Sequence, residues 1–273
     1  MRLTLIQPRQ NFLYDFAHQE RPLSLAQAQT GVREMEEQTF ALMEQAPAAD
    51  LVVTTEAVNF PGQEKQLPVP YGELIREEPL LSRFAAFAKA RHCYVAAGHY
   101  ARDGKGVRNR LTVFDRQGTV AAVYDKVHLA GDEQRSLVAG DRYCVLEADF
   151  GRVGLCICWD MQFPEVCRHY ALSGARLVIC PTWGWESIYA HARAYENGIF
   201  VAGAMSVPYK EAIAGIRTPS EVVAPDGCVV AQAAPDAAQQ LTMELELNAM
   251  EELHTLRMHD RRPETYGMLA RWQ

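Results

Sequence analysis

The chain carries a thiol, a carboxylate and an ammonium group at the ends of three predicted strands: Cys158, Glu56 and Lys126. Functional sites of α/β proteins collect at the carboxyl ends of strands, so we expect these side chains to meet. A thiol nucleophile, a carboxylate that carries protons and an ammonium that stabilises an oxyanion form a complete set for acyl transfer. The sequence therefore predicts acyl-transfer chemistry.

Cys158 stands in the segment GLCICWDMQFPE, in which a buried strand is expected to deliver the thiol to a turn before a helix that starts at Pro164. A helix N-terminus favours a thiolate, and backbone N–H groups there can face a developing oxyanion. We assign that role to the N–H of Trp159. Because free cysteine is among the most buried residue types, simple packing is the alternative for Cys158 taken alone.

Glu56 and Lys126, each considered alone, also have a non-catalytic interpretation. Glu56 ends the apolar run LVVTTE, where burial would raise its pKa and suit it to general-base catalysis; the alternative is a loop glutamate in water. Lys126 follows a predicted strand, and its alternative is a lysine that extends to solvent. Glu133 alone is an ordinary loop carboxylate.

A metal site is considered at Cys156 and Cys158, because residues two apart on a strand point to the same face. No second cysteine pair or closely spaced histidine pair follows at zinc spacing, and His169 and His191 are isolated. We therefore expect no metal.

Composition excludes several classes of protein. The 273 residues carry a net charge of −7, so there is no basic surface for nucleic acid or an anionic membrane. No apolar run approaches the length of a membrane span, and the N-terminus has no signal-peptide core. Seven cysteines without a secretory signal predict free thiols and a cytoplasmic location.

Strands and helices alternate along the chain, with hairpins between them, and no linker or repeat divides it, so we expect one domain over 1–273. Several strands are almost entirely apolar, which indicates burial on both faces and favours a helix–sheet–sheet–helix sandwich. The expected helices are 25–45, 80–91, 164–173 and 187–197, and the expected strands are 1–7, 51–53, 93–100, 111–115, 119–124, 153–158, 177–180, 199–207, 221–224 and 228–231.

In this order and context, Glu56, Lys126 and Cys158 resemble the Glu–Lys–Cys triad of the nitrilase superfamily of carbon–nitrogen hydrolases. The resemblance covers nearly the whole chain, and Glu133 matches the family's second glutamate, seven residues before Gly140. It implies a four-layer αββα sandwich, no cofactor or metal, and a homodimer or higher homo-oligomer that pairs across helices near the nucleophile.

The resemblance points to the amidase-like branch, which cleaves a small carboxamide to acid and ammonia through a thioester on Cys158. The sequence after the nucleophile favours amide or carbamoyl substrates over nitriles. Trp159, Trp183 and Trp185 are candidates for the pocket walls, with core packing as the alternative. Arg110 and Arg193 are candidates to bind a substrate carboxylate, although Arg193 is expected to pair within its own helix or with a neighbouring loop.

Three other functions stay open. The first is an N-carbamoyl amino acid or amine amidohydrolase with the same triad. The second is a papain-like protease that would pair Cys158 with His128 or His169 and would not need Lys126. The third is a catalytically silent binding protein on the same fold, because a fold does not guarantee a function.

Overall fold

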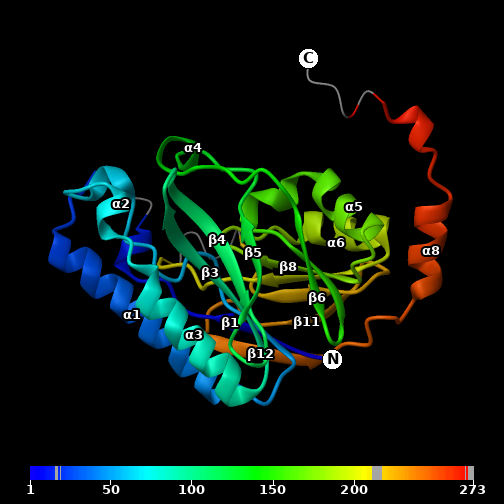
Figure 1. Ribbon diagram of the computed structural model, residues 1–273, viewed down its shortest axis with the longest axis horizontal. Helices are drawn as coiled ribbons and strands as arrows, with labels where there is room; N and C mark the ends of the chain where they lie inside the picture. Colours follow the sequence, from blue (N-terminus) through cyan, green and yellow to red (C-terminus); the bar gives the residue numbers. More distant parts are fainter. Residues whose placement is uncertain (16–17, 19, 211–216, 268, 270–273) are drawn as a thin grey trace.

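The computed structural model describes residues 1–15, 18, 20–210, 217–267 and 269. Two six-stranded mixed sheets form its centre (Figure 1). The first sheet has the strand order β12-β1-β2-β3-β4-β5. Its strands are β1 (Arg2–Gln7), β2 (Leu51–Val53), β3 (Tyr94–Asp103), β4 (Gly106–Phe114), β5 (Val120–Asp125) and β12 (Gln239–Glu244).

The second sheet has the strand order β11-β10-β9-β8-β7-β6. It is built from the middle of the chain and the segment after residue 217. Its strands are β6 (Cys144–Ala148), β7 (Gly151–Leu155), β8 (Leu177–Pro181), β9 (Phe200–Ala204), β10 (Glu221–Val223) and β11 (Val229–Gln232).

Helices cover the outer face of each sheet. The long helices α1 (Leu25–Gln45) and α3 (Glu77–Arg91) pack on the first sheet, and α5 (Pro164–Leu172) and α6 (Ser187–Asn197) pack on the second (Figure 1). Among the described residues, the other helices are α2 (Tyr71–Leu74), α4 (Glu133–Ser136) and α8 (Glu251–His259), with 3-10 turns η1 (Phe12–Tyr14), η3 (Glu64–Gln66), η4 (Cys158–Gln162) and η5 (Pro263–Thr265).

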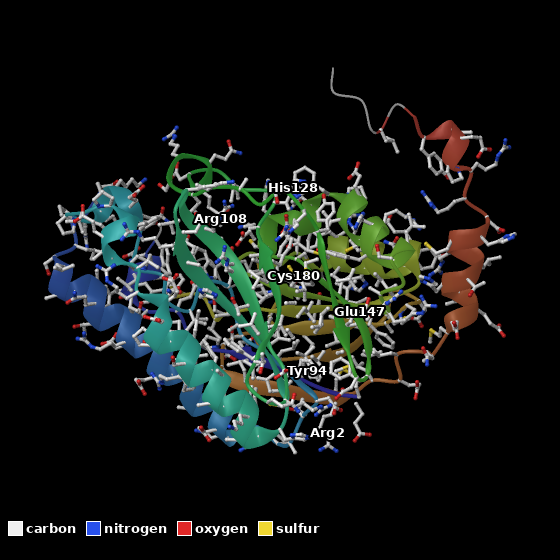
Figure 2. The ribbon with its side chains drawn as sticks, viewed as in Figure 1. Arg2, Tyr94, Arg108, His128, Glu147 and Cys180 are labelled. Carbon is white, nitrogen blue, oxygen red and sulfur yellow. The ribbon has the colours of Figure 1, made fainter. Side chains whose placement is uncertain are left out.

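Three apolar layers hold this arrangement together. The central layer joins the facing sides of the two sheets through residues such as Leu5, Val113 and Ile179. The two outer layers join α1 and α3 to the first sheet and α5 and α6 to the second. Cys180 lies among the interior side chains of the outer layer beside α5 and α6 (Figure 2). The expected four-layer αββα sandwich is confirmed.

The middle of each sheet is parallel, which determines where the site forms. Strands β1, β2 and β3 run parallel in one sheet, and β7, β8 and β9 run parallel in the other. Strand β5 is antiparallel to β4, which is antiparallel to β3, so β5 ends at the same edge as β2 and β3. Glu56, Lys126 and Cys158 follow β2, β5 and β7 in the chain.

The local signals predicted most elements, with a few corrections. The helix expected at 80–91 begins at Glu77, and the strand expected at 199–207 is limited to Phe200–Ala204. Ser187 is the first residue of α6, and its hydroxyl donates to Glu221 at 2.7 Å. The sequence does not predict strands β6 and β12 or helix α8.

No described helix is long and apolar enough to cross a membrane.

Candidate active site

Glu56 is positioned by a close approach of strand β3 to the loop that follows β2. The N–H of Gly98 donates to the Thr54 hydroxyl at 3.0 Å, and the N–H of Val58 donates to the Gly98 carbonyl at 2.8 Å. A Cβ atom on Gly98 would lie 2.5 Å from the Thr55 carbonyl oxygen. Only glycine therefore fits at this position, and the loop that carries Glu56 is fixed to the sheet.

The Glu56 carboxylate is buried and fully engaged. Its Oε1 accepts from Lys126 Nζ at 2.9 Å and from Asn109 Nδ2 at 2.8 Å, and its Oε2 accepts from the Trp183 backbone N–H at 3.0 Å. Burial raises the pKa of Glu56 above its ordinary value, Lys126 opposes the rise and Glu133 adds to it. The site thus holds a carboxyl group of raised basicity, as a general base requires.

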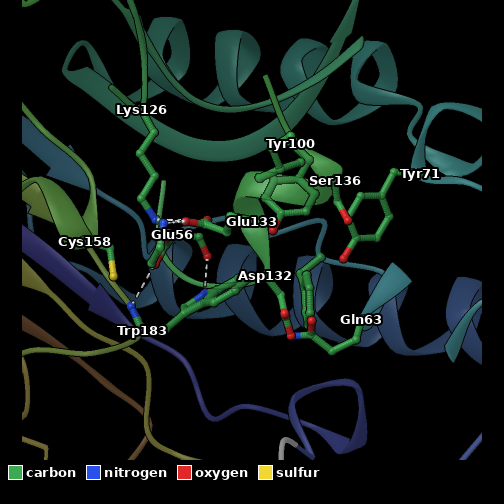
Figure 3. Close-up of a pocket in the computed structure, with 13 residues that line it drawn as sticks. Glu56, Gln63, Tyr71, Tyr100, Lys126, Asp132, Glu133, Ser136, Cys158 and Trp183 are labelled. Carbon is green, nitrogen blue, oxygen red and sulfur yellow. Dashed lines mark hydrogen bonds and ion pairs between the residues drawn. The ribbon is translucent and has the colours of Figure 1, made fainter. Parts of the chain in front are cut away.

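Lys126 lies between two carboxylates. Its Nζ donates to Glu56 and also to both oxygens of Glu133, at 2.9 and 2.7 Å, while its side chain is 1% exposed (Figure 3). Burial alone would lower the pKa of Lys126, but the charges of the Glu56 and Glu133 carboxylates beside it raise it well above its ordinary value. Lys126 is therefore a permanent cation in this site.

Two backbone contacts hold Lys126 in place. Its N–H donates to the Asn109 carbonyl at 2.9 Å, and its carbonyl accepts from the Gly140 N–H at 2.8 Å. A Cβ atom on Gly140 would lie 2.2 Å from the carbonyl oxygen of Asp125, so a side chain there would push the lysine segment away. Glu133 opens the short helix α4 and accepts from the Ala130 N–H at 2.8 Å.

The sequence predicts that Cys158 ends a strand over 153–158. In the structure β7 ends at Leu155, so Cys158 lies beyond the strand. It begins the 3-10 turn η4 with φ of 46°, a conformation that L-residues rarely adopt and that costs about 1–3 kcal/mol. The turn brings its thiol into a cavity, across from Glu56 (Figure 3).

The thiol is not pre-ionised. Burial raises the pKa of Cys158 to about 12; Glu56 adds to the rise, while Lys126 and a hydrogen bond to Thr182 oppose it. The expectation of a helix-stabilised thiolate is therefore wrong, because desolvation in a closed site outweighs the N-terminus of a single short turn. A neutral thiol needs a base beside it before it can attack a carbonyl carbon, and Glu56 lines the same cavity as Cys158.

Two further polar residues, which no sequence motif indicates, complete the site. Asn109 on β4 donates from Nδ2 to both Glu56 and Glu133, at 2.8 and 3.0 Å. The buried Asp160 accepts from the Tyr124 hydroxyl at 2.7 Å, from the Ile157 N–H at 2.9 Å and from His128 Nδ1 at 2.8 Å. Asp160 thus links the turn that carries Cys158 to Tyr124 and His128, which flank Lys126 in the chain.

Glu56, Lys126, Glu133 and Cys158 line a cavity of about 220 Å³. Its size suits a small molecule, since drug-sized pockets usually start at about 300 Å³. Lys126, Glu56 and Glu133 lie together near Cys158, and Tyr71 and Tyr100 line another part of the wall (Figure 3). Phe60 is a third aromatic lining residue. The lining residues are Glu56, Phe60, Gln63, Tyr71, Tyr100, Lys126, Ala130, Asp132, Glu133, Ser136, Leu137, Cys158 and Trp183.

The three candidate tryptophans have different environments. Trp183 lines the cavity, and its indole Nε1 donates to the Glu56 carbonyl at 2.7 Å. Trp185 is fully buried against Gly203 and belongs to the outer core layer. The side chain of Trp159 is 41% exposed and does not line the cavity, so only its backbone N–H can face the nucleophile.

The candidate arginines and histidines lie outside the cavity lining. Arg110 pairs with Asp125 at 2.6 Å, and Arg193 pairs with Glu196 in its own helix at 3.3 Å. The His128 ring stacks on Phe163 at 4.0 Å and bonds to Asp160. His169 packs near Tyr143. The structure therefore gives a Cys–His protease no histidine partner among the described residues of the cavity.

The two cysteines of the Cys156-x-Cys158 segment do not share a face. Cys156 points into the core, 3.5 Å from Met161 Sδ and 3.4 Å from the Ile179 carbonyl, whereas Cys158 lines the cavity. The expected alternation of side chains between two faces fails because β7 ends at Leu155, before Cys156. Over the described part of the chain, no group of three or more His, Cys, Asp or Glu side chains is arranged to hold a metal ion.

Comparison with known proteins agrees with this geometry. A family model described as carbon-nitrogen hydrolase matches residues 2–255. A "hydrolase in pqqF 5'region" from Pseudomonas protegens is 32% identical, over 72% of each chain. The omega-amidase NIT2 of Homo sapiens is 31% identical, over 70% of this chain and 74% of its own.

Solved structures resemble the whole chain. A carbon-nitrogen hydrolase from Helicobacter pylori superposes with a TM-score of 0.78 at 22% identity, covering 100% of this chain and 98% of its own. An amidase variant from Nesterenkonia sp. AN1, with the acetamide moiety of fluoroacetamide added covalently at its active-site cysteine, has a TM-score of 0.72 at 25% identity, covering 98% and 97%. With the family model spanning most of the sequence, this chain belongs to the carbon–nitrogen hydrolase family.

Proposed function

We propose that this protein is a thiol-dependent amidase that hydrolyses a small carboxamide to its acid and ammonia, with Glu56, Lys126, Cys158 and Glu133 as its site. The observation that carries the proposal is the convergence of these four side chains on one cavity of about 220 Å³. The omega-amidase and amidase relatives support an amide as the bond that is cleaved. We further propose that residues 1–273 act as one domain.

In the first half of the reaction, Glu56 takes the Cys158 proton as the sulfur attacks the amide carbonyl carbon. The resulting oxyanion is stabilised by Lys126 and by the backbone N–H of Trp159. Glu56 then gives the proton to the amide nitrogen, the C–N bond breaks and ammonia leaves. A thioester remains on Cys158.

In the second half, Glu56 takes a proton from water, and the hydroxide attacks the thioester carbonyl. The C–S bond breaks, the acid leaves, and the proton returns from Glu56 to the Cys158 sulfur. Both oxygens of Glu133 lie within 2.9 Å of Lys126 Nζ, so a single ammonium N–H of Lys126 can donate to both. Another N–H of the same ammonium is then available to donate to the oxyanion. Glu133 is thus a positioning residue that keeps the ammonium in place.

The test is ammonia release by the purified protein from a panel of small carboxamides, N-carbamoyl amino acids and nitriles. We expect release from carboxamides. Preferential release from the carbamoyl compounds would reassign the substrate class, and release from none of them, with Cys158 also unreactive toward iodoacetamide, would favour the silent binding protein.

The pH profile gives a separate prediction for the general base. Glu56 must be ionised to accept the thiol proton, and its pKa lies above the ordinary 4.5, so kcat/KM should fall on the acid side through an apparent pKa above 4.5. Glu56→Gln should lower kcat/KM by about 10²–10⁴-fold and remove this acid limb. Its residual rate should rise steadily with pH, because burial still holds the pKa of the Cys158 thiol above its ordinary value and the thiolate forms only as the pH rises. An unchanged acid limb in Glu56→Gln would assign the titration to another group.

We also propose a homodimer that pairs through η4 and α6, near the nucleophile. Ile188 and Tyr195 lie two helical turns apart on one side of α6 and are 76% and 57% exposed, and Trp159 on η4 is also exposed. Exposed apolar side chains of this size on neighbouring elements are typical of an interface. Ile188→Asp should convert a dimer into a monomer in sedimentation velocity. A wild-type protein that sediments as a monomer would contradict the proposal.

All seven cysteines are unpaired, which suits a reducing compartment, and we propose the cytoplasm.

A further inference from the structure

Asn109 and Lys126 donate to the same two carboxylate oxygens. Asn109 Nδ2 lies 2.8 Å from Oε1 of Glu56 and 3.0 Å from Oε1 of Glu133, and Lys126 Nζ lies 2.9 Å from each of these oxygens. The backbone carbonyl of Asn109 also accepts from the Lys126 N–H at 2.9 Å. Asn109 therefore holds the two carboxylates with its amide and the lysine with its backbone.

The orientation of the buried Asn109 amide is set by these carboxylates. An ionised carboxylate only accepts hydrogen bonds, and an amide NH2 group has two hydrogens, so Nδ2 can supply one to each. The reverse orientation would place Oδ1 against two carboxylate oxygens. In the observed orientation Oδ1 is buried without a hydrogen-bond partner among the described residues, which is unfavourable. The amide thus keeps both hydrogens on the carboxylates although its own acceptor stays unsatisfied.

The two oxygens of Glu56 differ in the number of donors that they meet. Each carboxylate oxygen has two lone pairs. On Oε1 both are occupied, by Lys126 and Asn109, whereas Oε2 accepts from one donor among the described residues, the Trp183 N–H at 3.0 Å. Oε2 therefore keeps a lone pair for a proton, and Glu56 and Cys158 line the same cavity.

We propose that Asn109 is a positioning residue for the general base: by sharing Oε1 of Glu56 with Lys126, it leaves Oε2 as the oxygen that takes the proton of Cys158. This inference deepens the proposed function and rests on it. As the proton moves to Oε2, the sulfur electron pair forms the bond to the carbonyl carbon and the carbonyl π electrons move to oxygen. Asn109 does not line the cavity, so it acts through Glu56 and not on the substrate.

The pH profile of Asn109→Leu tests this role. Burial raises the pKa of Glu56, and the hydrogen bond from Asn109 opposes the rise. Without that bond Glu56 stays protonated to higher pH, so the acid limb of kcat/KM should move to higher pH by about one unit. Above the limb, kcat should fall by about 10-fold or more, because the carboxylate loses a bond that orients it. KM should change by less than about threefold, because residue 109 does not line the cavity.

The other titratable and charged groups around Glu56 are unchanged in this variant, so the displacement of the limb reports the loss of the Asn109 amide. These groups are Lys126 after β5, Glu133 on α4, Cys158 on η4, Tyr14 on η1, Tyr100 on β3, and Arg217 beside Trp183.

Asn197→Leu is the matched control. Asn197 is also buried, its Nδ2 donates to the Arg193 carbonyl at 2.8 Å within α6, and its Oδ1 has no partner among the described residues either. This variant should lower the free energy of unfolding, measured in urea, and leave the acid limb where it is.

A second variant, Asn109→Asp, keeps the size of residue 109 and replaces the NH2 donor with a carboxylate. A third carboxylate beside Glu56 and Glu133 disfavours ionisation of Glu56. The acid limb should therefore move at least as far as it does in Asn109→Leu. Rates of all variants are taken per folded molecule.

Alkylation of Cys158 by iodoacetamide measures the same proton transfer without amide turnover. The Cys158 sulfur bonds to the reagent's methylene carbon, iodide leaves and Glu56 takes the thiol proton. Peptide mass mapping over a pH series follows Cys158, with the exposed Cys228 as the reference thiol. The acid limb of this alkylation should move to higher pH in Asn109→Leu and stay in place in Asn197→Leu.

An acid limb at the wild-type pH in both Asn109 variants would overturn the proposal. An equal displacement in Asn197→Leu would also overturn it, since loss of stability would then explain the effect. If no carboxamide is hydrolysed but the alkylation limb moves with Asn109, the proposed function fails and the positioning of Glu56 stands. Hydrolysis of carboxamides with an alkylation limb that does not respond to Asn109 would give the reverse result.

Discussion

Cys158→Ala should abolish ammonia release from every carboxamide, by at least about 10⁴-fold in kcat. In the proposed mechanism the Cys158 thiol forms the covalent intermediate. No other described cysteine or serine in the cavity has Glu56 and Lys126 beside it, because Ser136 lines the opposite wall (Figure 3). The measurement is steady-state ammonia release with the best carboxamide, with mass spectrometry of the wild type to detect the acyl adduct on the Cys158 peptide.

Cys156→Ala is the control for this variant. It removes a thiol two residues away that packs against Met161, so the protein should lose stability through the small cavity it creates but keep its turnover per folded molecule. Substantial turnover by Cys158→Ala, or loss of activity only in Cys156→Ala, would contradict the assignment of the nucleophile.

Lys126→Met should have the second largest effect, on both rate and stability. Without the ammonium, the buried Glu56 faces Glu133 with no cation between them, so one carboxyl group takes up a proton and the base is lost. We expect a loss of about 10²–10³-fold in kcat/KM from the oxyanion contact alone. Removing one partner of a buried ion pair costs about 3–5 kcal/mol in the free energy of unfolding.

The measurements are kcat/KM and urea unfolding at neutral pH. Lys65→Met is the matched control, because Lys65 pairs with Asp132 at 3.8 Å at an exposed position and should contribute less than about 1 kcal/mol. The double variant Lys126→Met, Glu133→Gln should regain part of the stability and none of the activity. A Lys126→Met protein with wild-type turnover would remove Lys126 from the mechanism.

The elements that the sequence predicts correctly are those with a clear pattern in their own residues. The apolar spacing in 25–45 matches α1, and the ends of α5 follow from Pro164 at its first turn and Gly174 beyond its last, where φ is 83°. Strand β12 was missed because it is half-exposed and forms only by pairing with β1, more than two hundred residues away. Such pairing depends on the tertiary fold and leaves a weak local pattern.

The same distinction applies to the site. The sequence predicts Glu56, Lys126 and Cys158 as site residues because each is a reactive side chain at the end of a predicted strand. Asn109 and Asp160 were missed because their partners lie on other elements. A signal for Asn109 existed, since it occupies the alternating face of β4 that otherwise carries Val107, Leu111 and Val113. A polar residue on such a face must find buried partners.

The site draws its groups from both sheets. Glu56 and Lys126 follow strands of the first, and Cys158 and Trp183 follow strands of the second. Contacts across the interface, such as Thr55 to the Thr182 carbonyl at 3.2 Å and Tyr124 to Asp160 at 2.7 Å, keep the two sets in register. Either half of the chain alone would carry an incomplete set: a thiol without its base, or a base without its thiol. Hydrolytic capacity therefore belongs to the assembled sandwich, and a newly made chain acquires it only when its two halves have closed on each other.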